Sequence, residues 1–188
     1  MATAGYASAQ TLPPQGYNFF DTQEARLIEA IVARLIPRDE HSPGADELGV
    51  PIFIDRQLAG PYGAGANTYM QGPFQTGTPQ QGFQASWVPA QFYKDALRRF
   101  DEVVRAGNGG SAFADLRPEQ QDAVLRALES GNLDLSPIAG KEFFSVVLAN
   151  TIEGFFADPI YGGNKDMQAW AMIGFPGVAA NNAENVKA

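Results

Sequence analysis

The chain has 188 residues, of which 45% are hydrophobic and 18% charged, a balance typical of a folded globular protein rather than a disordered one. Its 13 Lys and Arg stand against 21 Asp and Glu, so the net charge of −8 argues against binding to nucleic acid or to anionic lipid through a basic patch. The absence of cysteine excludes disulfides, thiol nucleophiles, cysteine-ligated iron–sulfur clusters and covalent attachment of c-type haem.

Residues 1–18 are expected to form a flexible tail. Within it, Ala7, Ser8 and Ala9 fit the small-residue pattern that precedes signal-peptidase cleavage, although no basic region or long apolar region comes before them. Two interpretations stay open, an Ala-rich tail or the end of a trimmed signal peptide. No stretch approaches the roughly 18 uninterrupted apolar residues of a membrane-spanning helix.

The first predicted helix lies within residues 19–40. Asp21 can cap its N-terminus, and Glu24 stands three residues later, as in a capping box. Pro37 is expected to end it. The apolar positions recur at helical spacing and indicate one buried face, made of Leu27, Ile28, Ile31, Val32 and Leu35.

A short second helix is predicted over residues 50–60, with Pro51 near its start and Gly60 after its end. Residues 60–88 differ, because they are rich in Gly, Pro and Gln, carry few charges and show no period. A connection this long is usually functional or disordered, and its aromatic residues argue against disorder. These residues are Tyr62, Tyr69, Phe74, Phe83 and Trp87.

Three longer helices are predicted after this loop. The first begins at Pro89 and carries an apolar stripe, and the second runs from Pro118 to a C-terminal Gly131. The third, within residues 141–156, is apolar around most of its circumference, so we expect it to be the most buried.

No alternating strands and no internal repeat are evident. We therefore expect a mainly α fold: a single domain over residues 19–177, with about four or five helices and long irregular connections rich in Gly, Pro and aromatic residues. Residues 178–188 are expected to be a polar C-terminal tail.

The residue types that carry most enzyme chemistry are sparse. His41 is the only histidine and lies in a polar turn without a second metal ligand at fixed spacing. The Gly-rich segments 63–67 and 161–166 match no phosphate-binding fingerprint and are interpreted as tight turns. Glu153 and Asp158 could serve as an acid–base pair, but a helix end and an Asp-Pro turn favour a structural or interface role.

Residues 153–177 are dense in aromatic residues, glycines and turns, and contain a short predicted helix over 167–173. Protein interfaces favour Tyr, Trp, Phe and Met over Lys and Glu. We therefore predict that this segment and the 60–88 loop contact a partner. The predicted partner-binding residues are Tyr62, Tyr69, Phe74, Phe83, Trp87, Asp158, Tyr161, Trp170 and Phe175.

Several stretches resemble the gluconate 2-dehydrogenase subunit 3 family over about residues 19–177. They are RLIPRDEHSPGADELGVPIFIDRQLAGPYG, YMQGPF, PQQGFQ and above all EGFFADPIYGGN followed by IGFPG. The resemblance implies a non-catalytic small subunit of a periplasmic, membrane-associated sugar-acid dehydrogenase. It also implies an FAD-dependent large catalytic subunit, a multihaem cytochrome c subunit, and a twin-arginine export signal that often accompanies the small subunit.

On this interpretation the chain itself binds no cofactor and no metal, and it has no catalytic residues to carry over from the family. It would stabilise the flavoprotein and help its export. Two alternatives of other classes stay open. One is a free-standing hydrolase or lyase that uses Glu153, Asp158 and His41, and the other is a periplasmic sugar-binding module that stacks sugars on exposed aromatic rings.

Overall fold

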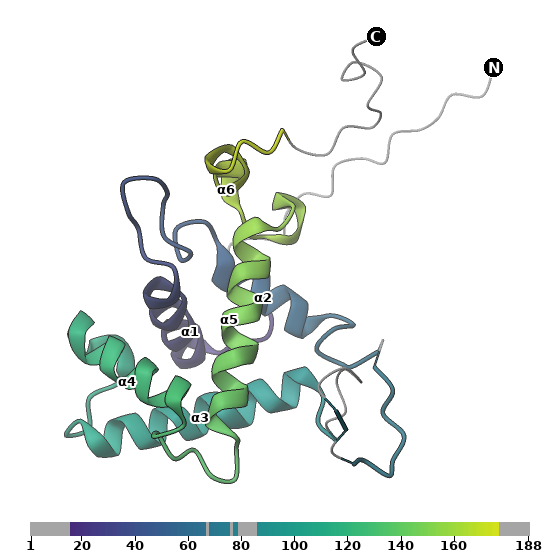
Figure 1. Ribbon diagram of the computed structural model, residues 1–188, viewed down its shortest axis with the longest axis vertical. Helices are drawn as coiled ribbons and strands as arrows, with labels where there is room; N and C mark the ends of the chain where they lie inside the picture. Colours follow the sequence, from purple (N-terminus) through teal and green to yellow (C-terminus); the bar gives the residue numbers. More distant parts are fainter. Residues whose placement is uncertain (1–15, 67, 76, 79–85, 177–188) are drawn as a thin grey trace.

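The computed structural model describes residues 16–66, 68–75, 77–78 and 86–176. Within these ranges the chain forms six α-helices and no strand (Figure 1). The helices are α1 (Thr22–Leu35), α2 (Val50–Ala59), α3 (Pro89–Gly107), α4 (Pro118–Ser130), α5 (Gly140–Phe156) and α6 (Gln168–Met172). Short 3₁₀ turns stand at η2 (Phe113–Asp115), η3 (Pro159–Tyr161) and η4 (Lys165–Met167).

The prediction of a mainly α fold is confirmed for the described residues, but the predicted count of four or five helices is wrong. The sixth helix, α6, is only five residues long. The chain turns just before this helix at Met167, whose φ of 58° is in the left-handed region. Helix α6 lies within the short helix predicted over residues 167–173, although it begins without a side-chain cap at Met167.

The predicted ends of α1 and α4 are confirmed by their capping geometry. The Asp21 side chain accepts hydrogen bonds from the backbone N–H groups of Gln23 and Glu24, and the Glu24 carboxylate accepts from the N–H of Asp21. At the end of α4, Gly131 has a φ of 77°, which a residue with a side chain rarely adopts, and this ends the helix.

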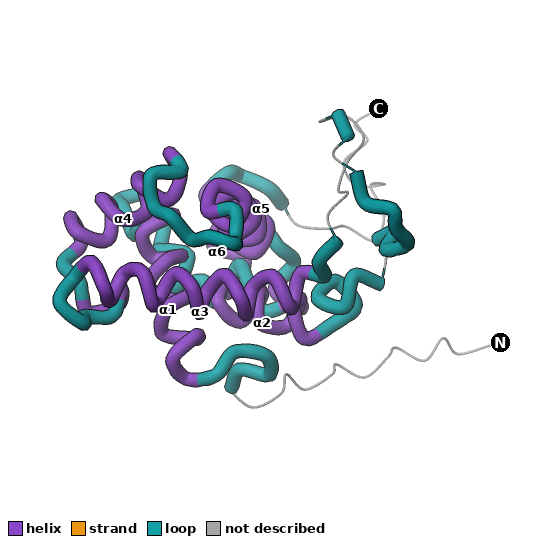
Figure 2. Tube along the Cα trace, turned by 90° about the horizontal axis from the view of Figure 1, so that it is seen from below, coloured by secondary structure: helices purple, strands orange, loops and turns teal. Residues whose placement is uncertain are grey.

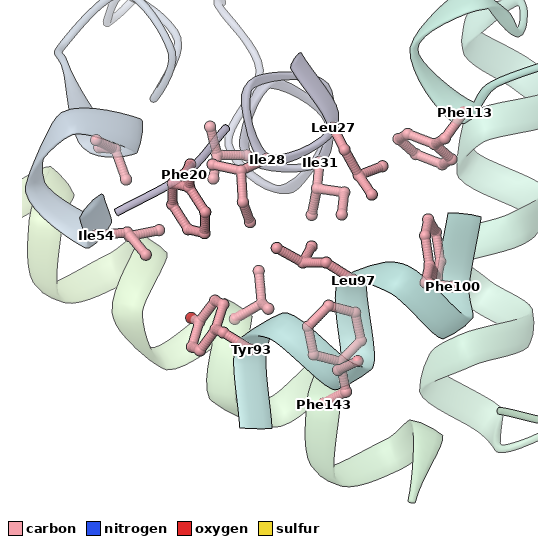
Figure 3. Packing of buried hydrophobic residues seen from close by; sticks show 14 of the residues in the cluster. Phe20, Leu27, Ile28, Ile31, Ile54, Tyr93, Leu97, Phe100, Phe113 and Phe143 are labelled. Atoms are coloured by element: carbon pink, nitrogen blue, oxygen red, sulfur yellow. The ribbon is translucent and has the colours of Figure 1, made fainter. Parts of the chain in front are cut away.

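Helix α5 is the centre of the arrangement, because it packs against α1, α2, α3, α4 and α6. Figure 2 shows it nearly end-on, with α3 lying across it. The core lies between these helices and combines aliphatic side chains with a group of aromatic rings (Figure 3). Phe143 of α5 contacts Tyr93 and Phe100 of α3 with ring centroids 6.2 Å apart in each pair, and Phe113 packs on Phe100 at 5.4 Å.

The prediction that the helix within 141–156 is the most buried is wrong. Helix α2 buries six of its ten residues, whereas α5 buries six of its seventeen. One side of α5 faces the core through Phe143, Val147 and Phe155. Ile152 on another side is 46% exposed, so an apolar face of this helix is left without cover by the described residues.

The buried carboxylate of Asp55 fixes the segment before α1. Its oxygens accept hydrogen bonds from the backbone N–H groups of Asn18, Phe19 and Phe20 at 2.7 to 2.9 Å. Three donors to one carboxylate satisfy a charge that burial would otherwise make costly. Asn18, which the sequence places in the N-terminal tail, is thus held against α2.

Candidate functional site

Exposed apolar side chains gather where the chain leaves α5. We call residues 157–176 the C-terminal cap; it contains η3, η4 and α6 and lies at the upper end of α5 in Figure 1. Exposed apolar side chains that are grouped rather than scattered mark candidate interfaces, so this region is one. Its exposed apolar residues are Ile160, Tyr161, Met167, Met172, Ile173 and Phe175, next to Ile152 and Phe156 at the end of α5.

The cap is fixed to α5 by close backbone contact. Asp158 caps η3, since its Oδ1 accepts from the N–H of Ile160 at 3.0 Å. Gly163 lies so near α5 that a Cβ there would be 2.0 Å from the carbonyl oxygen of Gly154. Only glycine fits such an approach, which explains the second glycine of the GGN turn.

Asn164 joins the cap to its surroundings. It is fully buried, with a left-handed φ of 46°. Its Nδ2–H donates to the carbonyl of Ala157 and its Oδ1 accepts from the N–H of Ala169, both at 2.9 Å. The next residue, Lys165, donates its backbone N–H to the carbonyl of Leu48 at 3.1 Å. The GGN turn therefore connects α5, α6 and the turn before α2.

The residues predicted from this segment to bind a partner have different surroundings. Trp170 is 9% exposed, and its indole N–H donates to the carbonyl of Phe156 at 2.8 Å. Its ring meets the ring of Phe175 edge-on at 5.1 Å. Phe175 and Tyr161 are exposed. Trp170 thus supports the cap from within, whereas Tyr161 and Phe175 face outward.

The predicted residues of the 60–88 loop lie elsewhere. Tyr69 is 77% exposed, and Tyr62 and Phe74 are also exposed. Trp87 is partly buried and stacks on Phe92 of α3 with centroids 4.0 Å apart. Figure 1 shows the loop beside the start of α3, well away from the cap. The structure therefore does not bring the two sets together, and Phe83 lies outside the described residues.

Asn150 of α5 is the centre of a polar cluster near that loop. Its Oδ1 accepts from the hydroxyl of Tyr93 at 2.7 Å and from that of Tyr62 at 3.4 Å, and its Nδ2–H donates to Glu153 at 3.1 Å. Burial raises the pKa of the Tyr93 hydroxyl well above its usual range, and burial also raises the pKa of Tyr62. Both phenols therefore stay protonated at neutral pH.

Sequence reasoning did not single out Asn150, Asn164 or Asp55, although each is buried and organises its surroundings. A polar residue inside an otherwise apolar stretch is the signal that could have found Asn150 and Asp55. Asn164 follows two glycines and adopts a left-handed conformation that Asn tolerates better than most residues, so its signal is the turn itself.

The candidate catalytic groups take part in local structure. His41 lies in an exposed turn, where Asp39 Oδ1 accepts from the N–H groups of His41 and Ser42; these bonds lower the pKa of Asp39. Glu153 binds Asn150, and Asp158 caps η3, which agrees with the structural interpretation of these acids. Among the described residues, no three His, Cys, Asp or Glu side chains are grouped to hold a metal ion.

The Gly-rich segments form turns where the structure describes them, as predicted. Gly65 and Gly162 both have left-handed φ values, of 65° and 109°. Neither segment follows a strand in the described part of the chain. Within the same residues, no helix combines the length and the apolar character needed to cross a bilayer.

A comparison with protein families matches residues 22–177 to the family described as gluconate 2-dehydrogenase subunit 3. No curated protein and no solved structure gives a significant match. The matched range includes all six helices and the whole cap, so it extends over far more than half of the chain. The chain therefore belongs to the gluconate 2-dehydrogenase subunit 3 family.

Proposed function

We propose that this chain is a non-catalytic small subunit of a periplasmic, membrane-associated sugar-acid dehydrogenase, with gluconate as the expected class of substrate. It would stabilise the large flavoprotein subunit and help its export. The observation that carries the proposal is the family match over residues 22–177, because it extends over nearly the whole helical body rather than one motif.

The division of chemistry between the subunits follows from this proposal. FAD and the oxidation of the sugar acid would belong to the large subunit, and c-type haem to a multihaem cytochrome subunit. A chain without cysteine has no thiol for covalent haem attachment, which supports placing the haem in a partner. This chain would bind no cofactor by itself.

Two surfaces are proposed to contact the partner. One is the 60–88 loop, where Tyr62, Tyr69 and Phe74 are exposed, and the other is the segment 158–177, where Tyr161 and Phe175 are exposed. Exposed Tyr and Phe side chains are the type that interface cores favour. The proposed contact would bury an area of standard size or more, roughly 1,600 Å² in total.

Co-purification tests this proposal. The full chain, expressed together with its large flavoprotein subunit, should elute with it at a fixed stoichiometry, and the purified chain alone should not oxidise gluconate. Independent elution of the two proteins, at concentrations well above a micromolar, would contradict the proposal.

The alternative of a stand-alone sugar-binding module has one observation in its favour, the exposed rings of Tyr69 and Phe74. Aromatic rings can stack on the apolar faces of sugars. Calorimetry with gluconate, glucose and fructose on the isolated chain tests this alternative. Saturable heat that is lost in Tyr69→Ala would support it, and absence of heat with all three would exclude it.

A further inference from the structure

We propose that the exposed apolar face of α5, together with the adjoining cap, is the main docking site for the large flavoprotein subunit. This inference rests on the proposed function and adds the face of α5, which lies outside the two segments named above. The matching face of the large subunit is proposed to be apolar at its centre and to carry charged side chains of both signs at its edge.

A single row of side chains forms this face. Phe144, Leu148, Ile152 and Phe156 are spaced by four residues, so they lie on one side of α5. The row spans about 18 Å at 1.5 Å per residue. Ile152 and Phe156 are exposed and the other two are half-buried, so the described residues cover the row incompletely.

The surface beside this row has the shape that a partner helix could fill. A shallow groove runs along it, lined by Phe144, Leu148, Ile152 and the small residues Ser145 and Ala149. Small residues let a second helix approach, while the larger side chains of the row pack beside it. A second groove continues from Phe144 and Leu148 toward α1 and α4, lined there by Leu35, Pro37 and Leu125.

The row ends beside the cap. Its last residue, Phe156, accepts the indole N–H of Trp170 through its carbonyl, and Trp170 contacts Phe175. The buried Trp170 therefore fixes the exposed ring of Phe175 relative to the end of the row. A helix that is apolar around most of its circumference is normally buried on all sides. The exposed side of α5 therefore indicates that a partner covers it.

The net charge of the chain favours a different protein over a second copy as the molecule that covers this face. A second copy of the chain would also carry a net charge of −8, so two copies repel one another. The family is that of a subunit 3, which implies other subunits, so a different subunit is the favoured occupant. Glu129 and Lys141 both line the groove, and the exposed Glu153 lies next to Ile152, so the edge of the face carries charges of both signs that a partner can pair with.

A matched pair of variants tests the inference. Ala149 and Ala123 are both exposed alanines within helices, but Ala149 lines the groove and Ala123 lies on α4 outside it. The large flavoprotein subunit is titrated with wild-type chain, Ala149→Glu, Ile152→Glu and Ala123→Glu, and Kd is measured at low and high salt. Circular dichroism and thermal unfolding check that each variant is folded.

We expect Ala149→Glu and Ile152→Glu each to raise Kd by a factor of about ten or more, because a charge is buried against an apolar partner. Ala123→Glu should bind like wild type, and binding by wild type should weaken as salt increases. If wild type binds and the two groove variants bind equally well, the surface is wrong while the proposed function stands.

Two other outcomes would overturn the assignment of this surface to the large subunit. If wild type does not bind the large subunit at all, the proposed function fails, and this assignment of the surface fails with it. If the isolated wild-type chain forms a dimer that Ala149→Glu dissociates, the face belongs to a second copy, and the assignment to the large subunit is overturned.

Discussion

Asp55 is the residue on which the N-terminal entry to the fold depends. Its charge is buried and accepts three backbone N–H groups. Asp55→Asn turns one acceptor oxygen into a donor that faces other donors, so we expect the free energy of unfolding to fall by about 2–4 kcal/mol. Urea denaturation measures this change. Asp46→Asn, at an exposed position, is the control and should be nearly neutral.

The ion pair of Arg34 with Asp122 makes a pH-dependent contribution. Arg34 donates from Nε and Nη2 to the two oxygens of Asp122 at 2.7 and 2.9 Å, and this lowers the pKa of Asp122. A carboxyl with a lowered folded pKa adds stability above its unfolded pKa and loses it as pH falls through the folded pKa.

The measurement for this pair is an NMR titration of the Asp122 carboxyl carbon. In wild type the midpoint should lie below the ordinary Asp value of about 3.9. In Arg34→Ala it should move up toward that value. An unchanged midpoint in the variant would mean that Arg34 does not set the pKa of Asp122.

At the scale of elements, the GGN turn lies against α5 with no room for a side chain at Gly163. A methyl group at Gly163 would meet the backbone carbonyl of Gly154, and backbone cannot move aside as a side chain can. We therefore expect Gly163→Ala to displace the cap, lower stability by about 1–3 kcal/mol and change the fluorescence of Trp170.

Gly107→Ala is the control for this variant. It lies at the end of α3, and an added Cβ there has nothing within 4 Å. Alanine is preferred to glycine in a helix, so this change should leave stability equal or raise it by about 0.5–1 kcal/mol. Comparable destabilisation by both variants would show that the close approach to Gly154 is not the cause.

Helix ends that are marked by a local sequence signal were predicted correctly. The capping box at Asp21 and the glycine at Gly131 are visible in the sequence and set real helix ends. The exact start of α6 and the burial of α5 could not be predicted in the same way. Both depend on tertiary contacts, namely the hydrogen bonds of Asn164 and the particular side of α5 that other helices cover.

The candidate site was predictable in part for the same reason. Aromatic density singled out the segment around Tyr161 and Phe175, which are exposed. It could not separate them from Trp170, because burial of a ring depends on where the chain folds back. It also missed the apolar face of α5, since a helix that is apolar all round gives no sign of which side stays open.

At the scale of the whole molecule, the arrangement is a helical body with its apolar excess concentrated at one end and along one face of α5. Its acidic net charge opposes the association of two copies. Both features suit a subunit whose exposed apolar face is covered by a different protein. This agrees with membership in a family of dehydrogenase subunits.

The most direct measurement is of the large flavoprotein subunit with and without this chain. Both are produced in one host, and the amount, location and gluconate-oxidising activity of the large subunit are followed. We predict that omitting the chain leaves little folded, active flavoprotein in the periplasm, and that restoring the chain recovers it. A large subunit that is exported, stable and fully active without the chain would contradict this account.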